Sequence, residues 1–261
     1  MSVSIKNSRE AFKATVMRVR VFSAWPEKII DKLIEDADLR RYKDGEHVLR
    51  AGDMANVMAI VAGGTFVSQR LKPDGEYMIF DYLLQGQATG FVAVLDGLPA
   101  SFDIVARGES DMVLIQRKSL LAAIALDPGR CWPDLVAMLG RRMRLEYEGT
   151  FMRTALSVRC QLAKLVLYWA RGQVTGANGE LRIPVAISQE DIAAMLGKST
   201  VTISKEITAL IKDGLLARAY KQIQITNPAG LERIVEREDP GSLQRSAALL
   251  NQSGAIFTGA D

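Results

Sequence analysis

The sequence predicts an α+β fold in which a β-rich N-terminal part, one long helix and a C-terminal winged helix-turn-helix follow one another. In residues 41–117, short apolar runs alternate with Gly and Asp turn signals, as in a barrel or sandwich. After Pro128 the apolar residues repeat at helical spacing. In residues 188–226, two capped helices joined by a short glycine-containing turn precede two strand-like runs.

The composition limits the class of protein. The chain has 261 residues, 48% of them hydrophobic, with a formal net charge of +3 and a pI near 8.8. These values suit two modest domains and permit, without requiring, a nucleic-acid partner. The two cysteines, Cys131 and Cys160, cannot form a disulfide framework, and no stretch of eighteen apolar residues is present. We therefore expect a soluble, cytoplasmic protein without a membrane partner.

Few residue types are available for catalysis or metal binding. His47 is the only histidine, which excludes a histidine-rich metal centre and most nucleophile–histidine triads. No phosphate-binding loop and no carboxylate pair placed by spacing is present. We expect no catalytic residue, no metal site and no enzyme activity, and we identify no resident cofactor.

Residues 1–128 are predicted to form the β-rich domain with its N-terminal helices. The first helix is expected over residues 8–21, and a second follows Pro26, which suits the first helical position. Strands are predicted over residues 47–49, 57–61, 65–69 and 77–83. We expect a turn at residues 63–64 and a hairpin loop at residues 73–76.

A long helix is predicted over residues 129–154, with a break or hinge at Gly149. Its apolar stripe, at i, i+3/i+4 and i+7 spacing, consists of Trp132, Leu135, Val136, Leu139, Met143 and Leu145. The stripe can pack on its own domain or on a second copy of the helix. We favour self-association, because little neighbouring chain is free to cover the stripe. The expected dimer contacts are Trp132, Leu135, Leu139 and Met143.

The C-terminal domain is predicted over residues 155–238. It begins with a helix over residues 157–170 and ends with a helix over residues 228–238. Between them lie a turn containing Gly172, Gly176 and Gly179, a strand over residues 181–185, and the helix-turn-helix with its wing. Residues 239–261 are expected to form a flexible tail.

Residues 188–225 hold the most specific pattern in the chain. Ser188 and Asp191 match a capping box that opens a helix over residues 189–196. Gly197 suits the left-handed turn at the end of this helix, and Ser199 caps the next one. The inward positions of the first helix are Ile192, Ala193 and Leu196. The strand-like runs that follow are expected to form the wing.

Within this segment, residues 198–224 are basic. Five Lys and Arg residues stand against Glu206 and Asp213, so about a tenth of the chain carries an excess of +3. The five are Lys198, Lys205, Lys212, Arg218 and Lys221. An ordinary helical hairpin with a basic surface is the alternative. The ordered series of caps, turn glycine and wing strands instead favours a domain that binds double-stranded DNA.

The C-terminal pattern resembles the DNA-binding domain of the catabolite-activator/Fnr (Crp/Fnr) family of bacterial transcription regulators. The resemblance is carried by Gln189-Glu-Asp-Ile-Ala193, Leu196-Gly197, Ser199-x-x-Thr202-x-Ser204-Lys205 and Gly214-Leu-Leu216. It extends over nearly the whole chain, because the glycine-punctuated strands are similar to the family's cyclic-nucleotide-type β-roll and residues 130–153 to its dimerisation helix. It implies a homodimer that binds a palindromic operator and works with RNA polymerase, with its DNA affinity under allosteric control.

By this resemblance, the base-facing side of the recognition helix holds Thr200, Val201, Ser204 and Lys205. Catabolite-type members have Arg, Glu and Arg at the positions of Thr200, Val201 and Lys205, so only the positive charge of Lys205 is kept. Valine contacts a thymine methyl but cannot accept a hydrogen bond from cytosine as Glu does, so we predict a different operator base at that position. The full expected DNA-binding set is Ser188, Gln189, Ser199, Thr200, Val201, Thr202, Ser204, Lys205, Arg218 and Lys221, of which the first two are expected to contact phosphate.

The resemblance is weaker in the ligand residues of the N-terminal domain. Members that bind cyclic AMP have Gly-Glu-Leu in the pocket loop and Arg-Ser about ten residues later. The matching residues here are Gly90-Phe91-Val92 and Ala100-Ser101, without the carboxylate and the guanidinium. A cyclic phosphate without its Arg loses charge-assisted hydrogen bonds of about 1.5–3 kcal/mol each. We therefore predict that the effector is not cyclic AMP.

The expected effector contacts are Gly90, Phe91, Val92, Ala100, Ser101 and Tyr147. Phe91 has two interpretations of equal weight, contact with a less polar effector and ordinary barrel core. Tyr147 can either hydrogen-bond an effector from the dimerisation helix or lie exposed at an interface.

Other sensors of the family are tested by counting ligands. An iron–sulfur cluster needs four cysteines, and the two present both follow residue 130. A haem would have only His47, which we expect at the surface. A redox switch through Cys131 or Cys160 stays open, although for Cys131 a buried structural thiol is the favoured interpretation. Two hypotheses remain, a regulator controlled by an unknown small molecule and a constitutive DNA-binding regulator whose barrel binds no ligand.

Overall fold

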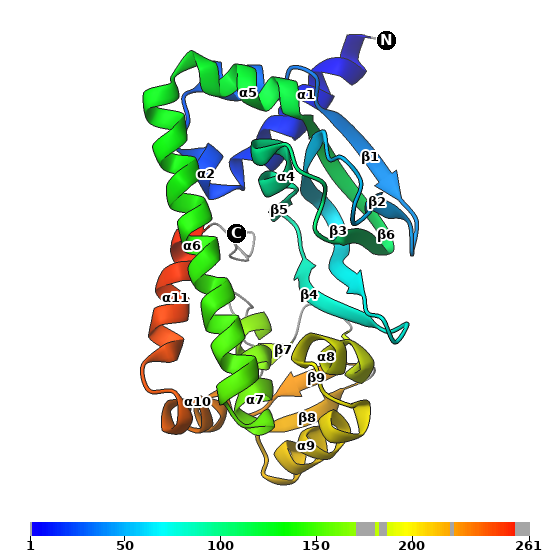
Figure 1. The fold of residues 1–261 in the computed structure, drawn as a ribbon, viewed down its shortest axis with the longest axis vertical. Helices are drawn as coiled ribbons and strands as arrows, with labels where there is room; N and C mark the ends of the chain where they lie inside the picture. The colour runs from blue at the N-terminus through cyan, green and yellow to red at the C-terminus, as the bar shows by residue number, and fades with distance from the viewer. Residues whose placement is uncertain (1, 171–180, 183–186, 220–221, 254–261) are drawn as a thin grey trace. The chain divides into compact units, whose positions relative to one another are not determined.

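The computed structural model describes residues 2–170, 181–182, 187–219 and 222–253. It forms two compact units, consisting mainly of Met1–Gly140 and of Arg141–Asn251. The first unit is built on an antiparallel β-roll and the second contains the winged helix-turn-helix (Figure 1). The predicted α+β class is therefore confirmed. The division between the units falls inside the long helix.

The β-roll of the first unit is a six-stranded antiparallel sheet. Its strands are β1 Asp38–Tyr42, β2 His47–Leu49, β3 Val57–Leu71, β4 Tyr77–Leu83, β5 Ala88–Thr89 and β6 Asp103–Gln116. β6 pairs with β1, β2 and β3, and β3 also pairs with β4 and β5. Successive side chains of β3 point to opposite faces, so Met58 and Ile60 join one buried cluster while Ala59 and Val61 join another.

Strand β3 is one strand of 15 residues where the sequence predicts two strands and a turn. The expected turn at residues 63–64 is wrong. Pairing with β6 runs from Val57 to Gln69, and only its register shifts, between Val61 and Thr65. Glycine is typical of turns and of bulges alike, and the partner strand decides between them. The predicted hairpin at residues 73–76 is confirmed, since the pairing of β3 with β4 continues to Leu71 and Tyr77, on either side of this loop.

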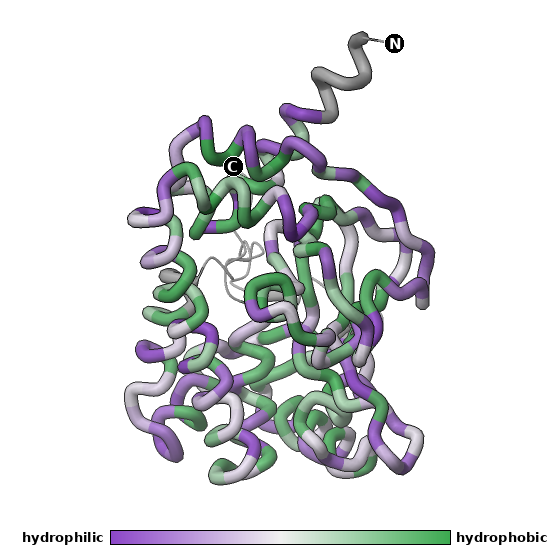
Figure 2. The backbone as a smooth tube through the Cα atoms, turned by 45° about the horizontal axis from the view of Figure 1, so that its top comes forward, coloured by the Kyte–Doolittle hydropathy of each residue, from purple (hydrophilic) through white to green (hydrophobic). Residues whose placement is uncertain are grey.

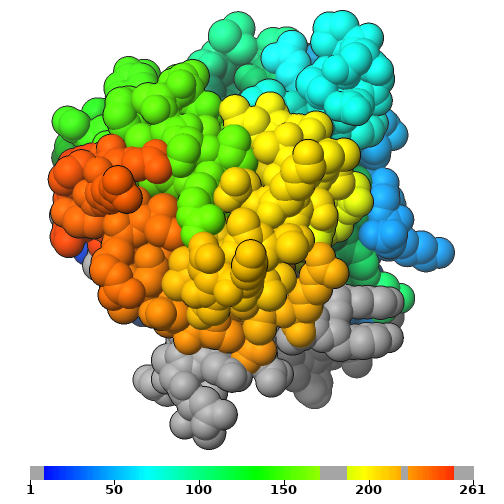
Figure 3. Space-filling view, turned by 90° about the horizontal axis from the view of Figure 1, so that it is seen from below, coloured from blue at the N-terminus to red at the C-terminus, as the bar shows by residue number. Residues whose placement is uncertain are grey.

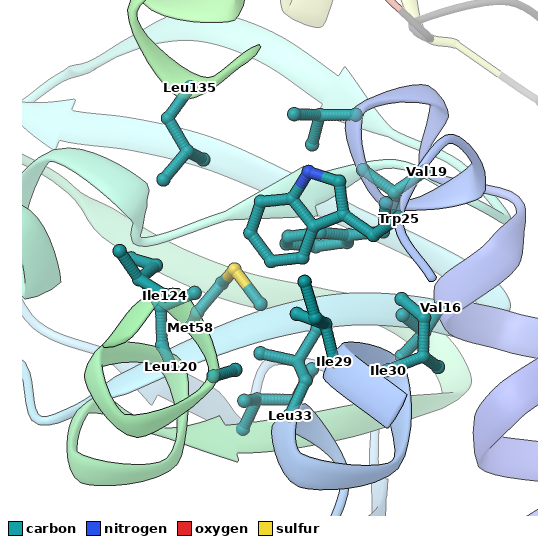
Figure 4. Packing of buried hydrophobic residues seen from close by; sticks show 14 of the residues in the cluster. Val16, Val19, Trp25, Ile29, Ile30, Leu33, Met58, Leu120, Ile124 and Leu135 are labelled. Atoms are coloured by element: carbon teal, nitrogen blue, oxygen red, sulfur yellow. The ribbon is translucent and has the colours of Figure 1, made fainter. Parts of the chain in front are cut away.

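Helices cover one face of this sheet. They are α1 Ser2–Met17, α2 Arg20–Ser23, α3 Glu27–Leu33, α4 Phe91–Asp96 and α5 Arg117–Leu126. The single helix expected over residues 8–21 is thus two helices, and Pro26 precedes α3 instead of occupying its first position. Trp25 lies within the apolar cluster shown in Figure 4, where its ring meets that of Phe22 edge-on at a centroid distance of 5.0 Å.

The long helix α6 runs from Pro128 to Ala155 without interruption. The break expected at Gly149 is therefore wrong, because one glycine costs a helix only about 1 kcal/mol and does not end it. Cys131, Leu135 and Met138 are buried in the core of the first unit, and Figure 4 shows Leu135 extending from α6 into that cluster. The single chain therefore already covers one side of the predicted apolar stripe.

The second unit combines helices with a three-stranded sheet of order β7-β9-β8. Its further elements are α7 Val158–Ala170, β7 Leu181–Arg182, α8 Gln189–Leu196, α9 Thr200–Lys212, β8 Leu216–Ala219, β9 Gln222–Ile225, α10 Pro228–Glu238 and α11 Ser242–Ser253. The predicted turn containing Gly172, Gly176 and Gly179 and the strand residues 183–185 lie outside the described residues.

Part of the expected flexible tail is helical. α11 follows α10 closely, and Arg245 in its first turns donates to Asp239, which in turn accepts from Lys164 in α7. Glu148 in α6 lies 3.6 Å from the same arginine. Leu243 and Ala247 stand at helical spacing on α11 and are half-buried, so apolar packing accompanies these charge contacts in the second unit.

No helix among the described residues is long and apolar enough to cross a membrane. Figure 2 shows polar positions interrupting the apolar ones along the helices.

Candidate nucleic-acid interface and effector site

The helix-turn-helix forms through the caps that the sequence predicts. Ser188 Oγ accepts from the backbone N–H of Asp191 at 3.0 Å, and Asp191 Oδ2 accepts from the N–H of Ser188 at 3.3 Å. Gly197 ends α8 in the left-handed conformation with a φ of 63°. Ser199 Oγ then accepts from the N–H of Thr202 at 3.2 Å and opens α9. These bonds begin both helices, and Gly197 forms the turn between them.

The inner faces of the two helices pack on the unit's own core. Ile192, Ala193 and Leu196 of α8 are buried, as predicted. On α9 the buried residues are Ile203, Ile207 and Leu210, which repeat at helical spacing. The opposite side of α9 is therefore left to solvent.

That outer side is a continuous stripe of exposed residues on α9, four, three and four positions apart. It consists of Val201, Lys205, Thr208 and Lys212. Val201 is 63% exposed, although it is apolar. Figure 3 shows the segment around α8 and α9, in yellow, at the surface of this view. We call these four residues the outer stripe of α9.

The expected DNA-binding residues occupy different places around this stripe. Thr200, Val201 and Lys205 are exposed, and Ser204 is half-buried beside them. The Thr202 hydroxyl lies 2.8 Å from Ser199 Oγ, so both side chains belong to the cap. Ser188 is exposed and Gln189 half-buried at the start of α8, and Arg218 is exposed on β8. Lys221 lies outside the described residues.

Two members of the outer stripe, Thr208 and Lys212, are absent from the expected set. Helical spacing counted forward from Val201 was the signal that could have found them. Both continue the line from Val201 and Lys205 toward the C-terminal end of α9.

The charge balance of this surface also depends on Arg159, which lies outside the basic residues 198–224. Arg159 of α7 forms ion pairs with both acids of residues 198–224, Glu206 at 3.8 Å and Asp213 in direct contact. Among the described residues, Lys198, Lys205, Lys212 and Arg218 form no ion pair. The basic side chains therefore keep their charges available, while Arg159 offsets part of the negative charge of the two acids.

In the first unit, the residues expected at an effector site lie around α4. Gly90 has a φ of 82°, and a Cβ built there would lie 2.8 Å from the carbonyl oxygen of Val57, so only glycine lets α4 approach β3 this closely. Phe91 is buried and its ring centroid lies 5.8 Å from that of Phe22, which supports the core interpretation. Val92 is exposed.

The second half of the expected effector site is apolar as well. Ala100 is buried against Ala55 and Ala93. Ser101 is exposed. Tyr147 belongs to the second unit and is 64% exposed. Phe91 and Ala100 are therefore buried and apolar. A cyclic phosphate and a ribose bound at these positions would need charged partners, which neither residue supplies.

Both thiols are buried. Desolvation raises the pKa of Cys160 to about 11, and nearby Glu238 adds to the effect. Burial also raises the pKa of Cys131, with Asp127 and Asp134 acting in the same direction. The thiolate is the reactive form, so these environments favour structural thiols over a redox switch. His47 is half-buried on β2.

Two domain families match this chain. A cyclic nucleotide-binding domain matches residues 39–127, and a Crp-like helix-turn-helix domain matches residues 161–234. With the β-roll, the long helix and the winged helix-turn-helix, these matches define a DNA-binding transcription regulator with a cyclic-nucleotide-binding-type domain. The chain belongs to the Crp/Fnr family.

Characterised relatives are similar at low identity. The chain is 24% identical over 204 residues to the CRP-like cAMP-activated global transcriptional regulator of Mycobacterium tuberculosis, covering 78% of this chain and 89% of that one. It is 26% identical over 200 residues to the nitrogen fixation regulation protein FixK of Rhizobium meliloti, covering 74% and 85%. The solved structure of FixK2 from Bradyrhizobium japonicum shares the fold with a TM-score of 0.66 at 22% identity, covering 76% and 96%.

Proposed function

We propose that this protein is a homodimeric, sequence-specific regulator of transcription that acts in the cytoplasm on a palindromic operator. The observation that carries the proposal is the outer stripe of α9, with uncompensated Lys205 and Lys212 beside an exposed Val201. Lysine side chains contact base edges or phosphates, and a valine in the major groove contacts a thymine methyl. Two copies of α9 about 34 Å apart would enter successive major grooves of B-DNA.

The proposed dimer contact is the exposed side of α6. Trp132, Val136 and Met143 are 42%, 63% and 57% exposed, and Leu139 between them is half-buried. Their spacing of four, three and four residues matches the seam of a two-helix coiled coil. The fully buried Leu135 belongs to the core of the first unit, so the proposed contact set now contains Val136 in its place.

The proposed effector is a small molecule other than cyclic AMP. Relatives include proteins named as activated by or receptors for cyclic AMP, but this chain has Phe91 and Ala100 at the positions of the acidic and basic ligand residues. An effector bound here would change DNA affinity through a coupling free energy of about 1–3 kcal/mol.

A second candidate is a constitutive regulator whose barrel binds no ligand. It is supported by the packing of Phe91, which is buried against Phe22 within the core of the first unit.

The test begins with selection of bound fragments from random DNA by the purified full chain, followed by anisotropy titration of the selected site. We expect a palindromic site, and binding that cyclic AMP leaves unchanged. Lys205→Ala is expected to weaken binding about tenfold or more, and the exposed Lys28→Ala on α3 serves as the control. No selected sequence, or equal loss in both variants, would contradict the proposal.

Native mass spectrometry of the same preparation tests the dimer and reports any retained small molecule. Met143→Asp is expected to give monomers, with the exposed Met54→Asp in the first unit as the control. In vitro transcription with RNA polymerase from the selected operator then shows whether the protein activates or represses. Binding that stays constant with and without cell extract would favour the constitutive candidate.

A further inference from the structure

Glu206 stands on α9 and Asp213 directly follows that helix. Both acids pair with Arg159, which lies on α7 outside the helix-turn-helix. Arg159 stands in the first turn of α7. Its Nη1 lies 3.8 Å from Glu206 Oε2 on α9, and its Nη2 contacts Asp213 Oδ2 at the end of α9. The three side chains are 32%, 30% and 50% exposed. The protein thus partly shields these three side chains from solvent.

Glu206 depends on Arg159 in particular. Its Oε2 atom is buried and accepts no hydrogen bond within the described part of the chain. Within the same described residues, Arg159 is the cation that lies within 4.0 Å of it. This carboxylate stands on α9 itself, and the cation that pairs with it comes from α7.

DNA makes such charges costly. The duplex carries one negative charge per about 1.7 Å of its axis, and at 0.1 M salt an uncompensated acid interacts with phosphates over about 10 Å. Glu206 directly follows Lys205 on α9, and Asp213 directly follows Lys212. Each acid would therefore oppose a lysine of the outer stripe.

We propose that Arg159 is a positioning residue for DNA affinity, which acts by compensating Glu206 and Asp213 instead of by contacting a base. This inference rests on the proposed DNA-binding function. Arg159 also joins α7 to α9, so a purely structural role is the competing explanation. Charge distinguishes the two, because the net charge of the group can be restored without restoring the ion pairs.

The experiment measures the affinity of the full chain for its selected operator at 50 mM and 300 mM salt. Arg159→Met makes the group one charge more negative and is expected to weaken binding about threefold to tenfold at 50 mM, and less at 300 mM. Adding Asp213→Asn returns the net charge to its original value and is expected to restore affinity to within about twofold. Adding Glu206→Gln as well is expected to give tighter binding than the original chain.

Two controls accompany these variants. Arg237→Met removes an exposed arginine of α10 in the same unit and is expected to leave affinity within about twofold of the original. Asp213→Asn alone keeps Arg159 and is expected to tighten binding. This single variant tests the proposal even if Arg159→Met does not fold.

The outcomes separate the explanations. A structural role predicts that all variants lacking Arg159 bind equally weakly, which would overturn the proposal. Unchanged binding by Arg159→Met, or by Asp213→Asn, would overturn it as well. An original chain that binds no selected operator would overturn the proposed function itself, and with it this inference.

Discussion

Replacing Asp239 with asparagine is expected to destabilise the second unit by about 3 kcal/mol. The side chains of Asp239 and Lys164 are only 7% and 8% exposed, and Lys164 Nζ donates to Asp239 Oδ2 at 2.7 Å. Arg245 Nη2 donates to the other oxygen at 2.8 Å. The carboxylate thus joins α7 to α11 through two charged hydrogen bonds.

The magnitude follows from the charge that the substitution leaves behind. Asparagine is neutral, so the ammonium group of Lys164 stays buried without a counter-ion. Removing one partner of a buried ion pair costs about 3–5 kcal/mol. The lower end applies here because Arg245 is half-exposed and regains hydration. For a unit of this size, the loss corresponds to a fall in Tm of about 10 °C.

The same pair predicts a pH dependence. Burial alone would raise the pKa of Asp239, but the hydrogen bond and charge of Lys164, with the hydrogen bond from Arg245, outweigh it and hold the pKa below its ordinary value. The folded state therefore takes up this proton less readily than the unfolded state. Its stabilisation is complete above the unfolded pKa of about 3.9 and is lost as the pH falls through the folded pKa.

Differential scanning calorimetry of the full chain at pH 7, and between pH 5 and pH 3, tests the prediction. The control is Asp74→Asn, which removes an exposed ion pair with Lys72 and is expected to leave the transition unchanged. The double variant Lys164→Met/Asp239→Leu is expected to recover most of the loss, because no buried charge remains. An Asp239→Asn transition that matches the original chain would refute the reasoning.

Further predictions concern the caps, the core, the thiols and the recognition helix. Ser188→Ala is expected to cost about 1 kcal/mol in urea unfolding, because it removes one half of the capping box. Phe91→Ala is expected to cost about 3–5 kcal/mol in the first unit, without producing affinity for cyclic AMP in calorimetric titration. Cys131 and Cys160 are expected to resist iodoacetamide at pH 8 in the folded protein and to react in urea, since burial raises both pKa values. Rapid labelling of either thiol in the native state would contradict the structural interpretation. Val201→Glu is expected to move the preferred operator base toward cytosine by about tenfold, and an unchanged selected site would show that this residue does not face a base.

Local sequence signals predicted the DNA-binding unit well because its helices depend on neighbours within four residues. The cap serines and Gly197 act on the backbone directly beside them, so Gln189–Leu196 and Pro228–Glu238 have the predicted bounds. Strands depend instead on pairing with residues far away in the sequence. The bulge in β3 and the turn predicted at the same glycines differ only in whether a distant strand, β6, continues to pair.

The candidate site was predictable to a similar degree. Spacing along α9 identified Val201 and Lys205, which are exposed, but did not separate Thr202, whose hydroxyl lies against the cap. Leu135 illustrates the same limit on α6. Its position in the apolar stripe is visible in the sequence, whereas its burial in the first unit follows from helices α2, α3 and α5 packing around it.

By itself, the sequence determined that this chain contains a helix-turn-helix with a basic surface, because caps, turn glycine and helical spacing act over a few residues. It also showed that the first unit lacks the charged residues expected for cyclic AMP. Only the tertiary structure decided that Arg159 compensates Glu206 and Asp213, and that Asp239 joins α11 to α7. The pairs of Arg159 with both acids and of Lys164 with Asp239 connect residues 47 to 75 positions apart. Their formation depends on how the whole unit packs, and no local pattern records it.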